Sequence, residues 1–558
     1  METGKMKKVL YILLAVFVLS ACSEDTTEYK QRKDELEQAN QEAQRKIDQE
    51  KNELEKKKQE QERLKQRLEE LERIKKGVVP DPQLLTMEFK KEDNSGLSES
   101  VVCDVYSSNG VVNCWLAGLN DSKTLIPRFT FDGTLVMNGS QEVTSGSTAI
   151  DFSQPVTLTV TTSKDTKEYV VYVYSYTGLP VMRIDTENGN FINSKTTYVN
   201  AHMKLTEDVR TRGAGDVLEA DLQIKGRGNS TWWREDWPKK PYRLKFNDKV
   251  SLLGEHKDRS WVLLANFADK SAIRNHVAFY MGKISNLDYT SSSHFVDLYL
   301  NGRYDGTYEL CEKLKVSNHR VAVGDDGFLL EVDTRASEDD EACYFYTEGL
   351  DAPINIKEPE TQYGDANFKY IENYMERVDN ALYGLNFRDT SKGWQAYMDM
   401  DSFVDWYLIN EISHNTDARM FTSCFMSLKR GEKLKMGPLW DFDLAFGNTD
   451  YWERGPEGFW IKDADWFDRL FKDPAFVNRV KERFDYFYDR MPDIMREMDA
   501  TCEYLKYSAA ANENRWHSFY NYGVPNVEIW GKYQNEVQSV KEWLRVRMDW
   551  LKSQYNKM

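Results

Sequence analysis

Three aspartates in the C-terminal half of the chain have the spacing of residues that could hold a cation. Asp417 follows an amphipathic segment, 398–412, which predicts a helix. Two predicted strands come next, and the second leads directly into Asp441 and Asp443, which alternate with apolar residues. Carboxylates in such a setting are costly unless a cation or hydrogen bonds compensate. The pattern therefore predicts a site for Mg²⁺ carrying nucleotide phosphates, since hard oxygen ligands suit that ion.

A glycine-rich turn followed by a basic strand offers the opposite charge. Residues 226–229 read Gly-Arg-Gly-Asn, and the next predicted strand carries Lys240, Arg243 and Lys245. Glycines let backbone N–H groups approach an anion closely, and the adjacent cations match phosphate charge. Taken alone, the pattern favours a glycine-rich hairpin whose basic strand is solvated, because single glycine loops are weak motifs.

Two further segments carry candidate polar residues. Arg274 lies in the first turns of a helix predicted to begin near Asp269, where it could face an anion or tie the helix to neighbouring carbonyls. A hairpin is predicted around the Asn-Gly turn at 301–302. Glu312 lies near its end beside Lys313, which could bind phosphate; a solvated pair is the alternative.

The order of these motifs resembles the CotH kinase family over about residues 181–452. The matching motifs, in order, are GRGNSTW, KKPYRLKF, FVDLYLNG, GFLLEVD, SFVDWYLINEI and GPLWDFDLAFGN. Several motifs in one order are far more specific than any one alone. The resemblance implies an atypical kinase-like fold that uses ATP and a divalent metal, Mg²⁺ or Mn²⁺, to phosphorylate serine in extracytoplasmic proteins.

The resemblance also implies roles for single residues. Asp417 would be the catalytic aspartate and Asp441 a metal ligand, with Asp443 helping, as in the order of the two aspartates of a protein kinase. The candidates for phosphate contacts are Lys240, Arg243, Lys245 and Arg274.

Two departures from protein kinases stand out. Thr422 occupies the position where a protein kinase keeps an Asn metal ligand, and the helix after Lys270 has no Glu, so Glu312 is expected to pair with the nucleotide lysine. These gaps fit an atypical kinase, and they also fit a pseudokinase that has kept only the fold.

The N-terminus predicts a lipid anchor. A basic start is followed by an apolar run, 9–19, of signal-peptide length, and Leu-Ser-Ala precedes Cys22, as in a bacterial lipobox. We expect a signal peptide over 1–21, lipidation of Cys22 and attachment to the membrane. The acidic residues at 24–25 resemble an export signal for the outer face of the outer membrane.

The remaining chain predicts a multidomain protein. Residues 22–79 are rich in Glu, Lys, Gln and Arg and predict a charged helical stalk that could self-associate as a coiled coil. Residues 80–177 alternate in the manner of an immunoglobulin-like β-sandwich, and 178–558 predict an α+β kinase-like domain.

Composition excludes some functions and leaves others open. The net charge of −17 argues against a nucleic-acid partner. Cys103 and Cys114 flank a predicted turn and could form a disulfide or be two buried thiols. The leading expectation is a kinase acting on envelope proteins or glycans. The alternatives are a non-catalytic surface module that binds a polysaccharide or a partner protein, and a glycosyltransferase using Asp441 and Asp443.

Overall fold

The computed structural model describes residue 65 and residues 81–558, with gaps at 98–99, 118–122, 207–216, 339–341, 451–453 and 521–527. The predicted signal peptide (1–21), Cys22 and all but residue 65 of the stalk, up to residue 80, lie outside the described residues, so these assignments stay predictions. In the part of the chain that is described, no helix is both long and apolar enough to cross a membrane.

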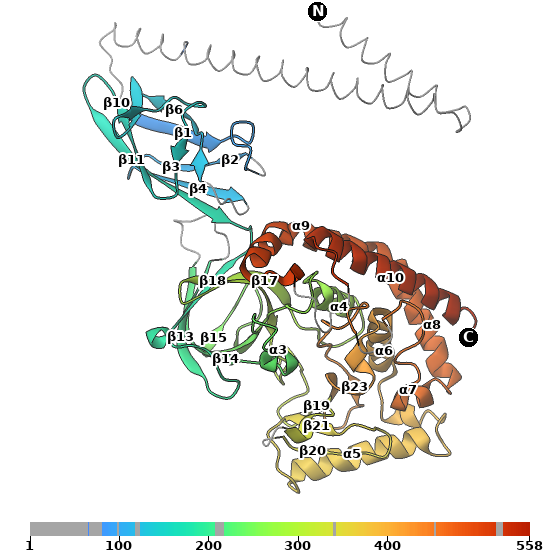
Figure 1. Ribbon diagram of the computed structural model, residues 1–558. Coiled ribbons are helices and arrows are strands. Elements are labelled where there is room, and N and C mark those ends of the chain that lie inside the picture. Colours follow the sequence, from blue (N-terminus) through green and yellow to red (C-terminus); the bar gives the residue numbers. More distant parts are fainter. Residues whose placement is uncertain are drawn as a thin grey trace, which may run out of the picture.

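The first group of strands forms two main sheets around one apolar core (Figure 1). The smaller sheet contains β1 (Gln83–Phe89), β2 (Val101–Val102) and β6 (Arg128–Asp132). The larger contains β3 (Asp104–Tyr106), β4 (Val111–Ala117), β11 (Thr166–Tyr176), β10 (Val156–Thr161), β7 (Leu135–Asn138) and β8 (Gln141–Glu142), and β5 (Thr124–Leu125) pairs with β9 (Ile150–Asp151). Cys103 and Cys114 are free, buried thiols in this core. The all-β character agrees with the sequence, and the immunoglobulin-like topology stays a prediction.

A closed barrel follows, which the sequence analysis did not predict. Its strands, in spatial order, are β12 (Val181–Thr186), β13 (Val199–Thr206), β14 (Val217–Gly226), β15 (Tyr242–Val250), β16 (Asp258–Leu264), β18 (Arg303–Glu312) and β17 (Ser293–Leu300). The parallel pairing of β12 with β17 closes it. The predicted hairpin is confirmed, because β17 and β18 flank Asn301 and Gly302, which both have positive φ angles. Its interior is filled by apolar side chains of alternating strand positions.

Helices and a second sheet complete the molecule (Figure 1). The sheet has the order β20 (Tyr344–Phe345), β21 (Ile354–Glu358), β19 (Phe328–Val332), β22 (Cys424–Leu428) and β23 (Lys435–Met436). The helices are α3 (Ser230–Trp233), α4 (Arg274–Lys283), α5 (Ala366–Tyr383), α6 (Met400–Ser413), α7 (Asp465–Leu470), α8 (Pro474–Asp489), α9 (Met491–Trp516) and α10 (Tyr533–Tyr555). The helix predicted at 398–412 corresponds to α6.

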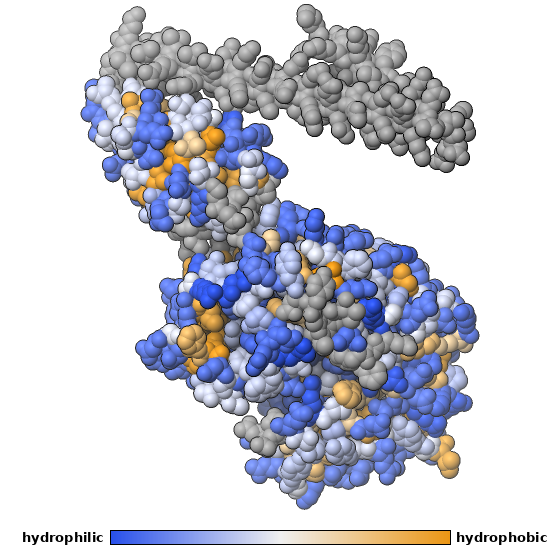
Figure 2. All heavy atoms as spheres, viewed as in Figure 1, coloured by the Kyte–Doolittle hydropathy of each residue, from blue (hydrophilic) through white to orange (hydrophobic). Residues whose placement is uncertain are grey.

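Helix α6 is the central element of this half. All of its residues from Ser402 to Ser413 are buried. It packs against α4, α8, α10 and β23. The ring of Trp406 stacks on Phe467, and the ring of Tyr407 contacts Phe467 at a tilt. On the face shown in Figure 2, the surface around this core is largely hydrophilic. Because α6 is closely packed against its neighbours, its C-terminus holds the start of the following segment in a defined position.

Candidate active site

The segment that carries Asp417 begins where α6 ends. His414 adopts the left-handed conformation (φ 47°) and ends the helix. The amide of Asn415 donates to Asn410 Oδ1 at 3.1 Å. A short 3₁₀ turn, η4 (Thr416–Ala418), then places Asp417 two residues beyond this anchor.

A buried ion pair fixes the last turn of α6. Glu411 and Arg547 are both fully buried, and Arg547 Nη2 donates to Glu411 Oε1 at 2.6 Å. The Glu411 carboxylate also accepts the backbone N–H groups of residues 460, 461 and 462 at 2.7–3.0 Å. All charge and hydrogen-bonding capacity of the pair is thus used internally, as burial demands. The pair joins α6, α10 and the 456–462 loop, and so holds the start of the Asp417 segment.

Three hydrogen bonds join the Asp417 segment to the loop that carries Asp441 and Asp443. Asn415 Nδ2 donates to Asp441 O at 3.2 Å, and Thr416 Oγ1 donates to Leu444 O at 3.0 Å. The backbone N–H of Phe446 donates to Ser413 O at 2.7 Å. The two motifs that the sequence placed one hairpin apart are therefore side by side in the fold.

Helix α4 holds the same loop from the other side. Asn275 Oδ1 accepts the backbone N–H of Phe442 at 2.7 Å, and Arg274 Nε donates to Ala445 O at 3.0 Å. The guanidinium of Arg274 is also paired with the buried Asp269. Arg274 therefore ties helix α4 to a neighbouring carbonyl, which is one of the two roles expected for it.

The three predicted aspartates come together. Burial raises the pKa of Asp443 well above its usual value, and the charges of Asp441, Asp417 and Asp269 raise it further, while Arg227 opposes the shift. Asp441 has a positive φ of 64° and accepts a hydrogen bond from Ser423 Oγ at 3.3 Å. Carboxylates gathered in this way favour binding of a further cation.

Arg227 faces these carboxylates from the glycine-rich turn after β14. Burial lowers the pKa of its guanidinium, and Asp441 and Asp443 oppose that effect. The guanidinium lies 5.6 Å from the centre of the Trp440 ring. The turn requires glycine at 226, because a Cβ there would lie 2.3 Å from the ring of Trp232.

Lys313 is the centre of a set of cations next to Arg227. Burial lowers its pKa to about 8, and the positive charges of Arg243, Lys357 and Lys315 lower it further, with Glu358 opposing. Arg243 also acts on the pKa of Arg227, and its buried Nε has no partner among the described residues. Four positively charged side chains are therefore close together: Lys313, Arg243, Lys357 and Lys315. Together with this buried Nε of Arg243, they suit a ligand with several negative charges.

Glu331 links these cations back to the aspartates. Its carboxylate lies 3.1 Å from Lys357 Nζ. Burial raises the pKa of Glu331; Lys357 opposes this, and Asp333 and Asp441 add to it. These side chains act on one another's pKa values through their charges, and we call the set the charge ring. Its members are Arg227, Arg243, Lys313, Lys357, Glu331, Asp441 and Asp443.

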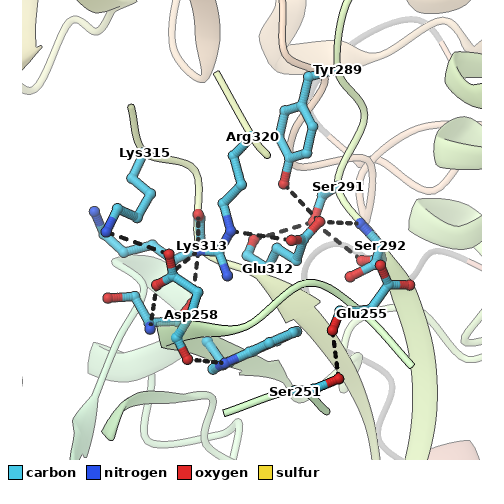
Figure 3. Close-up of polar contacts among 12 residues, drawn as sticks. Ser251, Glu255, Asp258, Tyr289, Ser291, Ser292, Glu312, Lys313, Lys315 and Arg320 are labelled. Atoms are coloured by element: carbon cyan, nitrogen blue, oxygen red, sulfur yellow. Dashed lines mark hydrogen bonds and ion pairs between the residues drawn. The ribbon is translucent and has the colours of Figure 1, made fainter. Parts of the chain in front are cut away.

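Three of the sequence-based candidates have other contacts. Lys240 Nζ donates to the carbonyls of Trp232 and Arg234 at 2.9 and 2.8 Å, which ties β15 to the turn around α3. Lys245 is exposed, with its ammonium 5.8 Å from the ring centre of Tyr198. Glu312 bonds to Arg320, not to a lysine (Figure 3).

Three members of the charge ring were not predicted from the sequence: Arg227, Lys357 and Glu331, the last of which lies in the quoted GFLLEVD motif. Arg227 lies in the quoted GRGN turn, so its motif was recognised although the residue itself was not selected. Lys357 lies on β21 within the Ile-Lys-Glu-Pro segment at 356–359, which also resembles the family, but the residue itself was not selected. Thr422, at the position of the expected second metal ligand, donates to Asp333 Oδ1 at 2.9 Å.

The residues present fit a divalent metal with a nucleotide. Among the described residues, no group of three or more His, Cys, Asp or Glu side chains could hold a metal ion by itself. Mg²⁺ needs no such cage, since it is commonly bound by one or two carboxylates together with substrate phosphates and water. Asp441 and Asp443 would supply the carboxylates, and the cations of the charge ring would face the phosphates.

Curated proteins and solved structures give no basis for a functional argument. None of the curated proteins matches this chain. Among solved structures, a DUF4623 family protein from Bacteroides eggerthii matches at 8% identity over 34% of this chain and 58% of its own, with a TM-score of 0.14. A candidate glycoside hydrolase from Bacteroides thetaiotaomicron matches at 15% identity over 51% of this chain and 85% of its own, with a TM-score of 0.15. This chain thus spans less than two thirds of the first of these structures, and neither likeness carries an argument.

The family comparison is decisive. The family described as CotH kinase protein matches residues 223–551, which include the glycine-rich turn, all three aspartates and Arg547. The match covers more than half of the chain and the whole of the charge ring. The chain belongs to the CotH kinase family.

Proposed function

We propose that this protein is an envelope kinase that transfers the γ-phosphoryl group of ATP, with Mg²⁺ or Mn²⁺, to hydroxyl groups of extracytoplasmic proteins, chiefly of serine and threonine. One observation carries the proposal: the aspartates of the family motifs lie close to the cations of the charge ring, and the buried Nε of Arg243 has no hydrogen-bond partner among the described residues. Phosphoryl transfer requires these two groups of charges next to each other.

Each part of the site has a task in this reaction. Asp417 would accept the proton of the attacking hydroxyl, as the catalytic aspartate of a kinase does. Arg227 and Lys313 would bind and orient the donor phosphates, and binding would favour the charged form of Lys313 against the burial that lowers its pKa. A divalent metal held by Asp441 and Asp443 supplies neutralisation of the phosphate charge when it is bound.

A non-catalytic role is the second candidate. Thr422 is committed to Asp333, and it also accepts a hydrogen bond from Arg335 at 3.1 Å. The position of the second metal ligand of protein kinases is therefore filled by a structural hydroxyl. A pseudokinase that binds a polysaccharide or a partner protein on the cell surface would tolerate this loss.

The cellular setting follows from the N-terminal sequence. We propose that lipidated Cys22 anchors the protein to the outer membrane, with the domain exposed at the cell surface and held away from the membrane by the segment 22–79. The acceptor would then be an envelope protein or glycan, and self-association through that segment would place two kinase domains near each other.

The test is phosphate incorporation from labelled ATP by the purified protein with Mg²⁺ or Mn²⁺. Asp417→Ala and Asp441→Ala should each abolish incorporation. Asp485→Ala, at a surface aspartate paired with Lys552, is the matched control and should leave it unchanged. A folded wild-type protein that neither binds ATP nor incorporates phosphate would favour the non-catalytic role.

A further inference from the structure

A buried network lies directly behind Lys313, at the end of β18 (Figure 3). Its centre is the ion pair of Glu312 and Arg320, whose side chains are 6% and 1% exposed, with Arg320 Nε 3.1 Å from Glu312 Oε1. A pair this deeply buried is costly unless its polar atoms are hydrogen-bonded. Nε and Nη1 of Arg320 are bonded, whereas its buried Nη2 has no hydrogen-bond partner among the described residues. Further contacts of Glu312 and Arg320 are with the main chain around Lys313 and with the segment before β17.

Arg320 bonds to the main chain on both sides of Lys313. Its Nη1 donates to the carbonyl of Lys313 at 2.8 Å and to the carbonyl of Ser260 at 2.8 Å. The same Ser260 carbonyl accepts the backbone N–H of Lys313 at 3.4 Å. The guanidinium also lies 3.7 Å from Asp258 and over the ring of Trp261. The carbonyl of Lys313 is thus bonded to Arg320 directly, and its N–H is bonded to the Ser260 carbonyl, which Arg320 also contacts.

Glu312 extends this network to the other side of the strand. Its Oε2 accepts the phenol O–H of Tyr289 at 3.0 Å and the backbone N–H of Ser292 at 3.3 Å. The end of β18 is thus joined to the segment that precedes β17. Figure 3 shows Glu312 between Tyr289, Ser292 and Arg320, with Lys313 beside them.

The network does not use the Lys313 ammonium, which donates to the carbonyl of Leu314 at 3.2 Å. Because Glu312 is used by Arg320, the carboxylate recorded nearest to Lys313 Nζ is that of Glu358, at 3.9 Å. In protein kinases a glutamate orients the nucleotide lysine by pairing with it directly. Here the carboxylate orients the lysine without neutralising it, through Arg320 and the backbone.

We propose that Arg320 and Glu312 are positioning residues that hold Lys313 in the charge ring for contact with the donor phosphates. The inference rests on the proposed function, because it takes a nucleotide as the ligand of Lys313. It replaces the expected Glu312–lysine pair by a relay of three residues: Glu312, Arg320 and the main chain of Lys313.

The test measures Mg-ATP affinity of the whole protein by calorimetry. Lys313→Ala should weaken binding at least tenfold, and Arg320→Lys and Glu312→Gln should each approach that loss. Adding Arg320→Lys to Lys313→Ala should cost little more, since residues that act through one group are not additive. Tyr289→Phe removes one hydrogen bond to Glu312 without changing charge, so it should weaken binding by a smaller factor.

A matched control separates positioning from stability. Arg483 forms an equally buried bidentate pair with Asp405 between α6 and α8, with N–O distances of 2.8 and 2.7 Å. Arg483→Lys should lower thermal stability like Arg320→Lys and leave Mg-ATP affinity unchanged. Wild-type affinity in the Arg320→Lys and Glu312→Gln variants, or equal losses in Arg320→Lys and Arg483→Lys, would overturn the inference.

A second readout does not depend on the nucleotide. Amine acetylation of Lys313, followed by mass spectrometry across pH, should reach half its maximum near pH 8 in the wild type. In Arg320→Lys the midpoint should move toward about 10.4, the value of a solvated lysine. An unmoved midpoint counts against the positioning role. Failure of the wild type to bind Mg-ATP, with the midpoint shifted in the variant, would instead contradict the proposed function.

Discussion

Asp443→Asn should stabilise the metal-free protein and remove its response to metal. Burial and three neighbouring aspartates disfavour the charge of Asp443, so a neutral isostere of the same shape relieves that cost. For a partly buried carboxylate with Arg227 nearby, we expect a gain of about 2 kcal/mol. The matched family region of about 330 residues unfolds with an entropy of about 0.7 kcal/mol/K, so the melting temperature should rise by about 3 °C.

The assay is thermal unfolding in chelator and in saturating Mg-ATP. Ligand at one hundred times its dissociation constant adds about 2.7 kcal/mol to the wild type, or about 4 °C on the same scale. In chelator, Asp443→Asn should melt above the wild type by most of the expected 3 °C (about 2 kcal/mol). Its melting temperature should rise little when Mg-ATP is added. Asp485→Asn, on an exposed aspartate, should show neither change. A variant that melts below the wild type in chelator, or that Mg-ATP stabilises as strongly, would refute Asp443 as a metal ligand.

Three further changes test the framework. Arg547→Met leaves Glu411 buried without its cation and should cost about 3–5 kcal/mol in denaturant unfolding; a loss below about 1 kcal/mol contradicts the anchoring role. Burial lowers the pKa of Lys239 from 10.5 to about 7. Keeping this lysine charged in the folded protein therefore lowers stability fully below pH 7, and the loss disappears as the pH rises toward 10.5. Lys239→Met should therefore melt higher than wild type at pH 7, with a gap that narrows by pH 9.5. Gly226→Ala forces a methyl group against Trp232, and thermal unfolding should show a loss of about 1–3 kcal/mol with a weaker Mg-ATP response.

The sequence predicts the local elements and the aspartates well because both depend on short-range patterns. Helix α6 begins and ends within two residues of the predicted segment, since apolar side chains recur along it and His414 ends it. The Asn-Gly turn at 301–302 fixes its own hairpin. The meeting of Asp417 with Asp441 follows from one hairpin, β22–β23, which returns the chain to the end of α6.

Barrel closure and the cations depend on pairings that no local pattern encodes. Strands β12 and β17 are joined in parallel although Val181 and its partner Asp297 lie far apart in sequence. The choice among basic residues is decided in the same way. Lys240 and Arg243 are three residues apart in one strand region, yet one bonds to the α3 turn and the other faces Lys313. Lys357 reaches the ring only because β21 pairs with β19.

The opposite charges of the site come from different parts of the fold. The barrel supplies Arg227, Arg243 and Lys313, whereas the α6–β23 segment and its loop supply the aspartates. Neither group is stable when left alone, because like charges held together raise each other's free energy. Placing the two groups next to each other lowers this electrostatic free energy. Helix α4 follows the barrel strand β16 and holds the Asp441–Asn448 loop through Asn275, so it fixes the distance between the cations and the aspartates. A kinase site built this way exists only when barrel and helices are docked, so changes at the α4 contacts should impair metal and nucleotide binding together.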